Sequence, residues 1–180
     1  MFTDGRSKKV VFIAHCLLNQ NSISDGTAVY PAACKTVIKF FLDSDIGIVQ
    51  MPCPEFRCLG LDRGNVHGAD YPVTIENTRI RKEMYKTAPS VLLTDLVSQV
   101  MQQILEYHKY GFEIIGIIGA NRSPNCGVDT TSDNNMEITG KGLFFEALSE
   151  QLKKEHLSIP MIGLKNTDDI VAKIKTLFEA

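Results

Sequence analysis

The sequence predicts an α/β protein in which a mostly parallel sheet lies between two layers of helices. Four short apolar runs alternate along the chain with segments whose apolar residues recur at helical spacing. The runs are continuously apolar, which is typical of parallel strands that are covered on both faces. With 180 residues, of which 44% are hydrophobic, the chain is long enough to bury its own core. We therefore expect one α/β domain that spans residues 1–180.

The first half of the chain contains two predicted strands with a helix between them. Lys9–Ala14 is an apolar run after two lysines, and Ile46–Met51 is a second run, which ends before a proline that cannot donate to a central ladder. Between them, a helical pattern begins at Tyr30 and Pro31 and extends to Leu42. The segment from Arg57 to Pro72 is rich in Gly, Asp and Asn and predicts a long loop over the strand ends.

The second half predicts two more strands and four helices. In chain order we expect a helix at Thr74–Lys86 that Pro89 ends, a helix from Leu93 to His108 closed by Gly111, a strand at Phe112–Gly119, a polar loop at Ala120–Gly142, a helix at Leu143–His156, a strand at Ile159–Leu164 and a helix at Asp168–Phe178. With right-handed crossovers, the simplest strand order is 2-1-3-4. That order describes a flavodoxin-like or Rossmann-like three-layer sandwich with a four-stranded sheet.

Charge and hydropathy exclude several classes of partner. The net charge is −2 with no long run of either sign, so we expect neither nucleic acid nor an anionic membrane as a partner. No apolar run is long enough to span a bilayer, and the first nine residues do not form a signal peptide. A cytoplasmic location follows as an expectation; the sequence does not fix the oligomeric state. In such a reducing compartment, five cysteines indicate metal binding or catalysis before disulfides.

Three of the cysteines directly follow predicted strands. Cys16, Cys53 and Cys126 each come just after the end of an apolar run. Parallel sheets bind ligands beyond the carboxyl ends of their strands, so the three thiols should converge at one edge. Cys34 falls inside a helical pattern and is expected in the core, whereas Cys58 is either a plain loop thiol or a fourth ligand.

Three converging thiols could hold zinc or an iron–sulfur cluster. Structural zinc sites often use Cys-x-x-Cys pairs, but the nearest pair here, Cys53 and Cys58, has four residues between its members. Three thiolates on a cubane cluster leave one iron without a protein ligand, which favours catalysis over electron transfer. A zinc-dependent hydrolase and a non-enzymatic module that binds a metal or small ligand are the alternatives.

Polar residues beside the cysteines are candidates for the same pocket. Glu55 either points toward it for acid–base work or is a solvated loop acid. Ser123 is placed either to hydrogen-bond a ligand or to cap its own turn. Arg122 could bind an anionic or carbonyl group of a substrate. His15 and Asn19, which flank the first cysteine motif, are further substrate-binding candidates.

Together the three motifs resemble those of the 2-thiouracil desulfurase family, over about residues 9–160. The matching segments are Cys16-Leu17-Leu18-Asn19, Cys53-Pro54-Glu55, Arg122-Ser123-Pro124-Asn125-Cys126-Gly127 and the Gly-x-Gly at residues 140–142. The family pattern has Gly at position 19, a small residue at position 15, and Gly-Gly-Leu-Pro in the stretch covered here by residues 56–64. These differences indicate a divergent branch.

The resemblance implies a 4Fe–4S cluster held by Cys16, Cys53 and Cys126, with one open iron. In that family the sulfur of a thiolated base coordinates this iron, and the carbon–sulfur bond is hydrolysed without net redox chemistry. Ser123 and Glu55 would then be the catalytic residues that position substrate or water and move protons. We expect a desulfidase acting on a small thio-compound, with a cluster that exposure to air could remove or replace with zinc.

Overall fold

A four-stranded parallel sheet forms the centre of the molecule. The computed structural model describes residues 2–165 and 168–178. Its main sheet has the order β2-β1-β3-β6, from β1 (Lys9–Ile13), β2 (Gly47–Gln50), β3 (Glu113–Ala120) and β6 (Met161–Leu164), all of which pair in parallel. The predicted α/β class and the order 2-1-3-4 of the four predicted strands are confirmed, β6 being the fourth.

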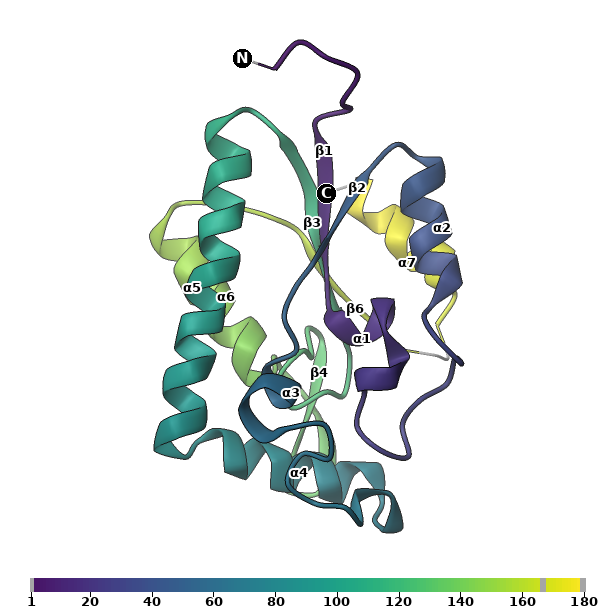
Figure 1. Cartoon of the computed structure of the whole chain (residues 1–180), viewed down its shortest axis with the longest axis vertical. Helices are drawn as coiled ribbons and strands as arrows, with labels where there is room; N and C mark the ends of the chain where they lie inside the picture. The colour runs from purple at the N-terminus through teal and green to yellow at the C-terminus, as the bar shows by residue number, and fades with distance from the viewer. Residues whose placement is uncertain (1, 166–167, 179–180) are drawn as a thin grey trace.

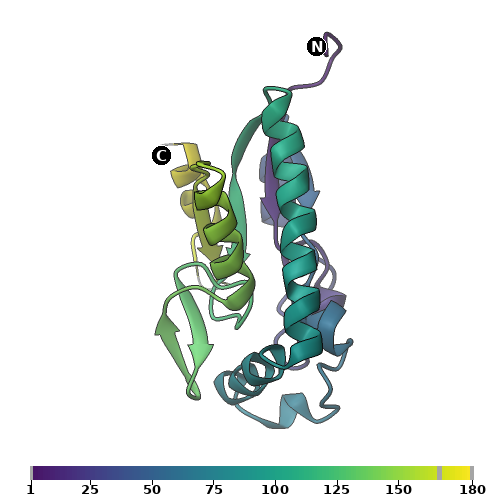
Figure 2. The same cartoon turned by 90° about the vertical axis from the view of Figure 1, so that its left-hand side faces the viewer.

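Helices cover both faces of this sheet. Figures 1 and 2 show α5 (Thr87–Lys109) and α6 (Leu143–Lys154) on one face, and Figure 1 shows α2 (Lys35–Asp43) and α7 (Ile170–Lys175) on the other. Side chains of a strand alternate between faces, so each residue of β1 serves one of two cores. Val10 and Phe12 pack with α5 and α6, whereas Val11 and Ile13 pack with α2 and α7. Burial on both faces explains why this strand is apolar from Val10 to Ile13.

The helix pattern around residues 93–108 is confirmed, but the role of Pro89 differs from the prediction. Helix α4 (Val73–Met84) ends before Pro89, and this proline lies in the first turn of α5. A missing N–H is tolerated there because a first-turn amide has no partner within the helix. At the other end of α5, Gly111 follows the C-cap with φ of 71°, the left-handed conformation that a C′ glycine typically adopts.

Other boundaries require correction. Helix α2 begins at Lys35 instead of Pro31, with Cys34 as its N-cap. The predicted loop from Arg57 overlaps α3 (Pro54–Leu59) and contains one 3₁₀ turn, η2 (Gly68–Asp70). Two short elements, α1 (His15–Leu18) and η1 (Gln20–Ser22), were not predicted as regular structure. The terminal helix begins at Ile170, later than the predicted Asp168, and ends in η3 (Thr176–Phe178).

A hairpin lies within the predicted polar loop Ala120–Gly142. Its strands β4 (Thr130–Asp133) and β5 (Met136–Thr139) pair antiparallel. Asn134 and Asn135 form the two-residue turn with φ of 48° and 61°, the left-handed values that a type I′ turn needs. The hairpin packs against α4 beyond the carboxyl ends of the main strands, where Figure 1 also shows α1 and α3.

Among residues 2–165 and 168–178, no helix combines the length and apolar character that a bilayer crossing needs.

Candidate functional site

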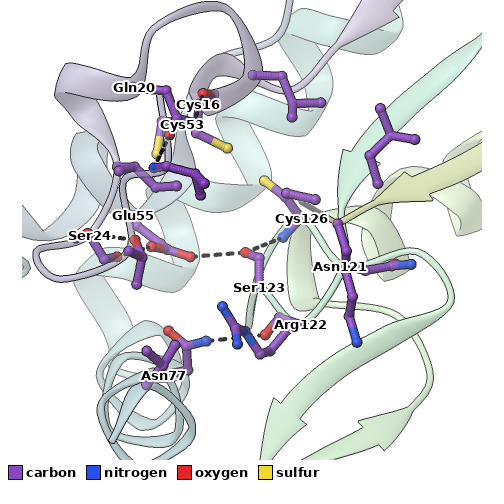
Figure 3. Close-up of a pocket in the computed structure, with 18 of the residues that line it drawn as sticks. Cys16, Gln20, Ser24, Cys53, Glu55, Asn77, Asn121, Arg122, Ser123 and Cys126 are labelled. Atoms are coloured by element: carbon purple, nitrogen blue, oxygen red, sulfur yellow. Dashed lines mark hydrogen bonds between the residues drawn. The ribbon is translucent and has the colours of Figure 1, made fainter. Parts of the chain in front are cut away.

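The three predicted thiols border one cavity of about 260 Å³. Cys16 lies in α1 directly after β1, Cys53 is the N-cap of α3 after β2, and Cys126 lies in the turn after β3. Because β2, β1 and β3 are parallel neighbours, their carboxyl ends meet at the same edge of the sheet. Figure 3 shows the sulfurs of Cys16 and Cys126 directed toward one another, with Cys53 on the same side of the pocket. All three are free cysteines.

These thiols oppose one another's ionisation. Burial raises the pKa of Cys16 to about 12 and that of Cys53 to about 11, and nearby Glu55 adds to both effects. The pKa of Cys126 also lies well above its ordinary value, because of burial first and the neighbouring thiols second. A bound cation reverses this balance, since it stabilises the thiolate directly. The donor set is therefore suited to a positively charged metal centre.

Different kinds of metal centre need their donors at different distances from one another. Within the described part of the chain, no three His, Cys, Asp or Glu side chains are grouped to hold a single metal ion. One zinc ion needs its donors within about 2.0–2.3 Å of a common point. In an iron–sulfur cluster each thiolate binds a different iron, so the sulfurs lie farther apart around a larger body. Cys16, Cys53 and Cys126 border a shared cavity from three different loops and could supply three such ligands.

Glu55 lies in the same pocket, at the centre of a hydrogen-bond network. Only 7% of the residue is exposed. One carboxylate oxygen, Oε1, accepts from Ser123 Oγ and Asn125 Nδ2, both at 3.2 Å. The other, Oε2, accepts from Ser24 Oγ and Arg63 Nε, both at 3.3 Å. Every contact donates to the carboxylate, an arrangement suited to its ionised form, which can only accept.

Ser123 connects this carboxylate to the Cys126 turn. Its Oγ accepts from the backbone N–H of Cys126 at 2.9 Å and from that of Asn125 at 3.2 Å, while its proton is donated to Glu55. Figure 3 shows this chain of contacts on the cavity wall. The structure thus brings together Glu55, Ser123 and the three cysteines, as the motifs predict.

The other predicted substrate-binding residues have different positions. Arg122 lines the cavity with φ of 72°, and its carbonyl accepts from Asn77 Nδ2 and Ser132 Oγ. Its guanidinium makes no hydrogen bond or ion pair with residues 2–165 or 168–178. Neither His15 nor Asn19 is brought to the cavity.

His15 and Asn19 instead make local contacts. The Nδ1 atom of His15 is paired with the Gln50 side chain, and its ring lies beside Phe56. Burial, together with the charge of Arg63, lowers the pKa of His15. The side chain of Asn19 accepts from the backbone of Asn21 and so caps η1.

The two remaining cysteines have structural positions. Cys34 is 1% exposed and packs in the core, as expected, and it also lines the cavity. Cys58 does not line the cavity, and its thiol donates to the carbonyl of Pro89 at 3.6 Å. This contact agrees with a plain thiol and not with a fourth ligand.

Several residues of the site were not singled out from the sequence. Asn125 is fully buried and donates to Glu55, and its own Oδ1 has no partner among the described residues. Gln20 donates to the carbonyl of Cys16 at 2.7 Å and accepts from the backbone of Val29, which holds the loop after Cys16 against the cavity. Arg63 is buried beside Glu55. In the sequence, Asn125 and Gln20 could have been recognised only by position, because Asn125 lies within the third cysteine motif and Gln20 directly follows the first.

Comparison with known proteins finds one similar chain of nearly equal length. The uncharacterized protein MJ0003 of Methanocaldococcus jannaschii is 27% identical over 173 residues, which cover 96% of each chain. No family model matches this sequence, and no solved structure does. The similarity assigns no activity, so a functional argument must come from the site itself.

Proposed function

We propose that this protein is an iron–sulfur desulfidase, which removes sulfur from a small thio-compound by hydrolysis. The observation that carries the proposal is that Cys16, Cys53 and Cys126 border one cavity with the hydrogen-bonded pair Glu55 and Ser123. The resemblance of these motifs to those of the 2-thiouracil desulfurases supports the same activity.

Cys16, Cys53 and Cys126 would hold a 4Fe–4S cluster. When bound, its one iron without a protein ligand supplies a soft Lewis acid that suits the sulfur of a thio-compound. The soft thiolate donors and the resemblance of the three motifs favour such a cluster over the single zinc ion of a hydrolase.

The reaction exchanges a C=S group and water for a C=O group and hydrogen sulfide, so no electrons are gained or lost. Glu55, held as an acceptor, takes a proton from the attacking water, and Ser123 lies between Glu55 and the Cys126 turn to orient that water. Arg122 donates to a carbonyl or anionic substituent of the substrate from across the cavity.

The apolar part of the cavity explains how a planar thio-compound would be held. Side chains from α1, the following loop, β6 and α7 form this wall: Leu17, Ile23, Val29, Leu164 and Ile170. Apolar walls with a few polar groups at fixed positions are typical of small-molecule sites.

Anaerobic purification with iron and sulfide analysis tests the proposal. The wild type should be brown and contain about four irons per chain. Cys53→Ser should lose most of this iron, whereas the matched control Cys58→Ser should keep it because the Cys58 thiol lies outside the cavity. The loaded wild type should release sulfide from at least one of a panel of thiolated bases.

Two results would contradict the proposal. A colourless wild type that binds no iron even after anaerobic reconstitution would exclude the cluster. A loaded protein that binds thiolated bases and releases no sulfide from any of them would instead indicate a non-enzymatic binding module.

A further inference from the structure

Arg63 is a buried cation at the edge of the cysteine cavity. It lies in the loop that follows α3 and lines the cavity, with only 2% of the residue exposed. Its φ of 56° is unusual for a residue with a side chain, so the local backbone is held by the surrounding structure. Arginine is rarely this deeply buried unless all its donors are used.

Its guanidinium connects three segments of the chain. Nη2 donates at 2.6 Å to the carbonyl of Ser22, a residue in the segment that follows Cys16. Nε donates to Glu55 Oε2 at 3.3 Å, and Nη2 lies 3.7 Å from Cys53 Sγ. Nη1 donates to two carbonyls of its own loop, those of Gly60 and Leu61. One side chain therefore links the loop after β1 to the start of α3.

The backbone of Arg63 is held separately from its side chain. Its carbonyl accepts from Arg79 Nη2 at 2.7 Å, and Arg79 is paired with Glu76 on α4. The loop would therefore keep an anchor on α4 if the Arg63 side chain were changed. Arg57 is the matched control for such a change, because it is exposed on α3 and its side chain makes no hydrogen bond or ion pair with the described residues.

Both the charge and the shape of arginine matter at this position. The carboxylate of Glu55 is buried, and removing one partner of a buried ion pair leaves the other uncompensated. A lysine would supply the charge, but its single ammonium cannot donate to all the separate acceptors that the planar guanidinium of arginine reaches together. The two properties can therefore be separated by substitution.

We propose that Arg63 is a positioning residue of this site: it fixes Cys53 and Glu55 relative to the loop after Cys16, and its charge balances the negative charge at that corner. The positioning contacts exist in the protein alone, while the role of the charge toward a cluster rests on the proposed function. Arg63 acts through Glu55 and Cys53 and is not itself a catalytic residue.

The first experiment uses the metal-free protein. The melting temperatures of the wild type, Arg63→Gln, Glu55→Gln and the double variant form a double-mutant cycle. We expect the double variant to lose less than the sum of the two single losses, because each single change leaves a buried group without its partner. Additive losses would overturn the proposal, whether or not the protein binds a cluster.

The second experiment uses the cluster-loaded protein. Cluster potentials depend on nearby charge and on hydrogen bonds to the sulfurs, so Arg63→Gln should lower the midpoint potential while Arg63→Lys stays close to the wild type. Both variants should lower kcat for sulfide release at least about tenfold, with KM changed less, because neither side chain can hold the three segments together. Arg57→Gln should keep the wild-type potential and kcat, because its exposed charge is screened by solvent.

The outcomes separate the two proposals. Wild-type potential and kcat in Arg63→Gln, or equal losses in Arg63→Gln and Arg57→Gln, would overturn the role of Arg63. A wild type that holds no cluster would overturn the proposed function, and the double-mutant cycle would then decide the positioning role of Arg63 alone.

Discussion

The direction of the Ser123 proton is set by its neighbours. Two backbone N–H groups, from Asn125 and Cys126, donate to Ser123 Oγ, so its own proton is directed to Glu55. Ser24 also donates to Glu55, at 3.3 Å, but makes no contact with the Cys126 turn. The two serines thus share a partner and differ in their connection to the thiols.

This difference gives a prediction for Ser123→Ala. The change removes the group that orients water beside Glu55, and losing one positioned proton-handling group typically costs about 100-fold or more in rate. We expect kcat for sulfide release to fall by about that factor in Ser123→Ala and by less than about tenfold in Ser24→Ala. Steady-state kinetics on protein of measured iron content checks this. Equal losses in both variants would mean that Ser123 only supports the carboxylate.

The positions of His15 and Asn19 show where motif adjacency fails as evidence. Both flank Cys16 in the sequence, but His15 begins a helix and Asn19 ends it. Consecutive residues on a helix point about 100° apart, so a neighbour of a cavity residue usually faces elsewhere. By contrast, Glu55 and Ser123 were correctly expected at the cavity, because a proline-fixed turn carries each beside a cysteine.

At the scale of elements, the strands were predictable and the smaller elements were not. Continuous apolar runs identified the four main strands because a parallel strand is buried on both faces. The hairpin strand β4 is Thr-Thr-Ser-Asp and contains no apolar residue that would indicate a strand. The Asn134-Asn135 pair, which favours a type I′ turn, was the sequence signal that could have predicted the hairpin. Arg63 could not be recognised, since its partner Ser22 lies 41 residues earlier and only the fold brings them together.

The loop that carries Arg63 is fastened to α4 by a charged cluster. Glu76, whose side chain is 8% exposed, pairs with Arg79 at 2.6 Å and accepts from Asn65 at 3.1 Å. The donated hydrogen bonds from Arg79, followed by that from Asn65, lower the pKa of Glu76 below its ordinary value of 4.5. The folded state therefore favours the ionised carboxylate more than the unfolded state does.

Stability should then depend on pH through Glu76. Because its folded pKa is lowered, its contribution is fully present above about pH 4.5 and is lost as the pH falls through the folded value. We expect Glu76→Gln to lower the free energy of unfolding by about 1–2 kcal/mol at pH 7. The gap in melting temperature between wild type and variant should narrow from pH 5 to pH 3, as measured by thermal unfolding of the metal-free protein. A gap that stays constant with pH would contradict this role.

At the scale of the whole molecule, the site joins parts of the chain that are far apart in sequence. Cys16 and Cys126 are separated by 126 − 16 = 110 positions, and Cys53 comes from a third loop. The two cores on either side of the sheet are made largely by other residues, so the protein should fold without a bound group. A cluster would then act as a cross-link between three loops of an already folded protein.

Cluster binding should therefore raise the stability of the whole fold. A ligand that binds only the folded state at about 1,000 times its Kd stabilises by about 4 kcal/mol, which for a chain of this size is a rise in Tm of about 10 °C. We expect this rise on anaerobic reconstitution of the wild type and of Cys58→Ser, and its absence in Cys126→Ser, with all three metal-free proteins melting cooperatively. Differential scanning calorimetry under anaerobic conditions checks it. If Cys126→Ser gained as much as the wild type, the cluster would be held elsewhere, and the three strand ends would not form one metal centre.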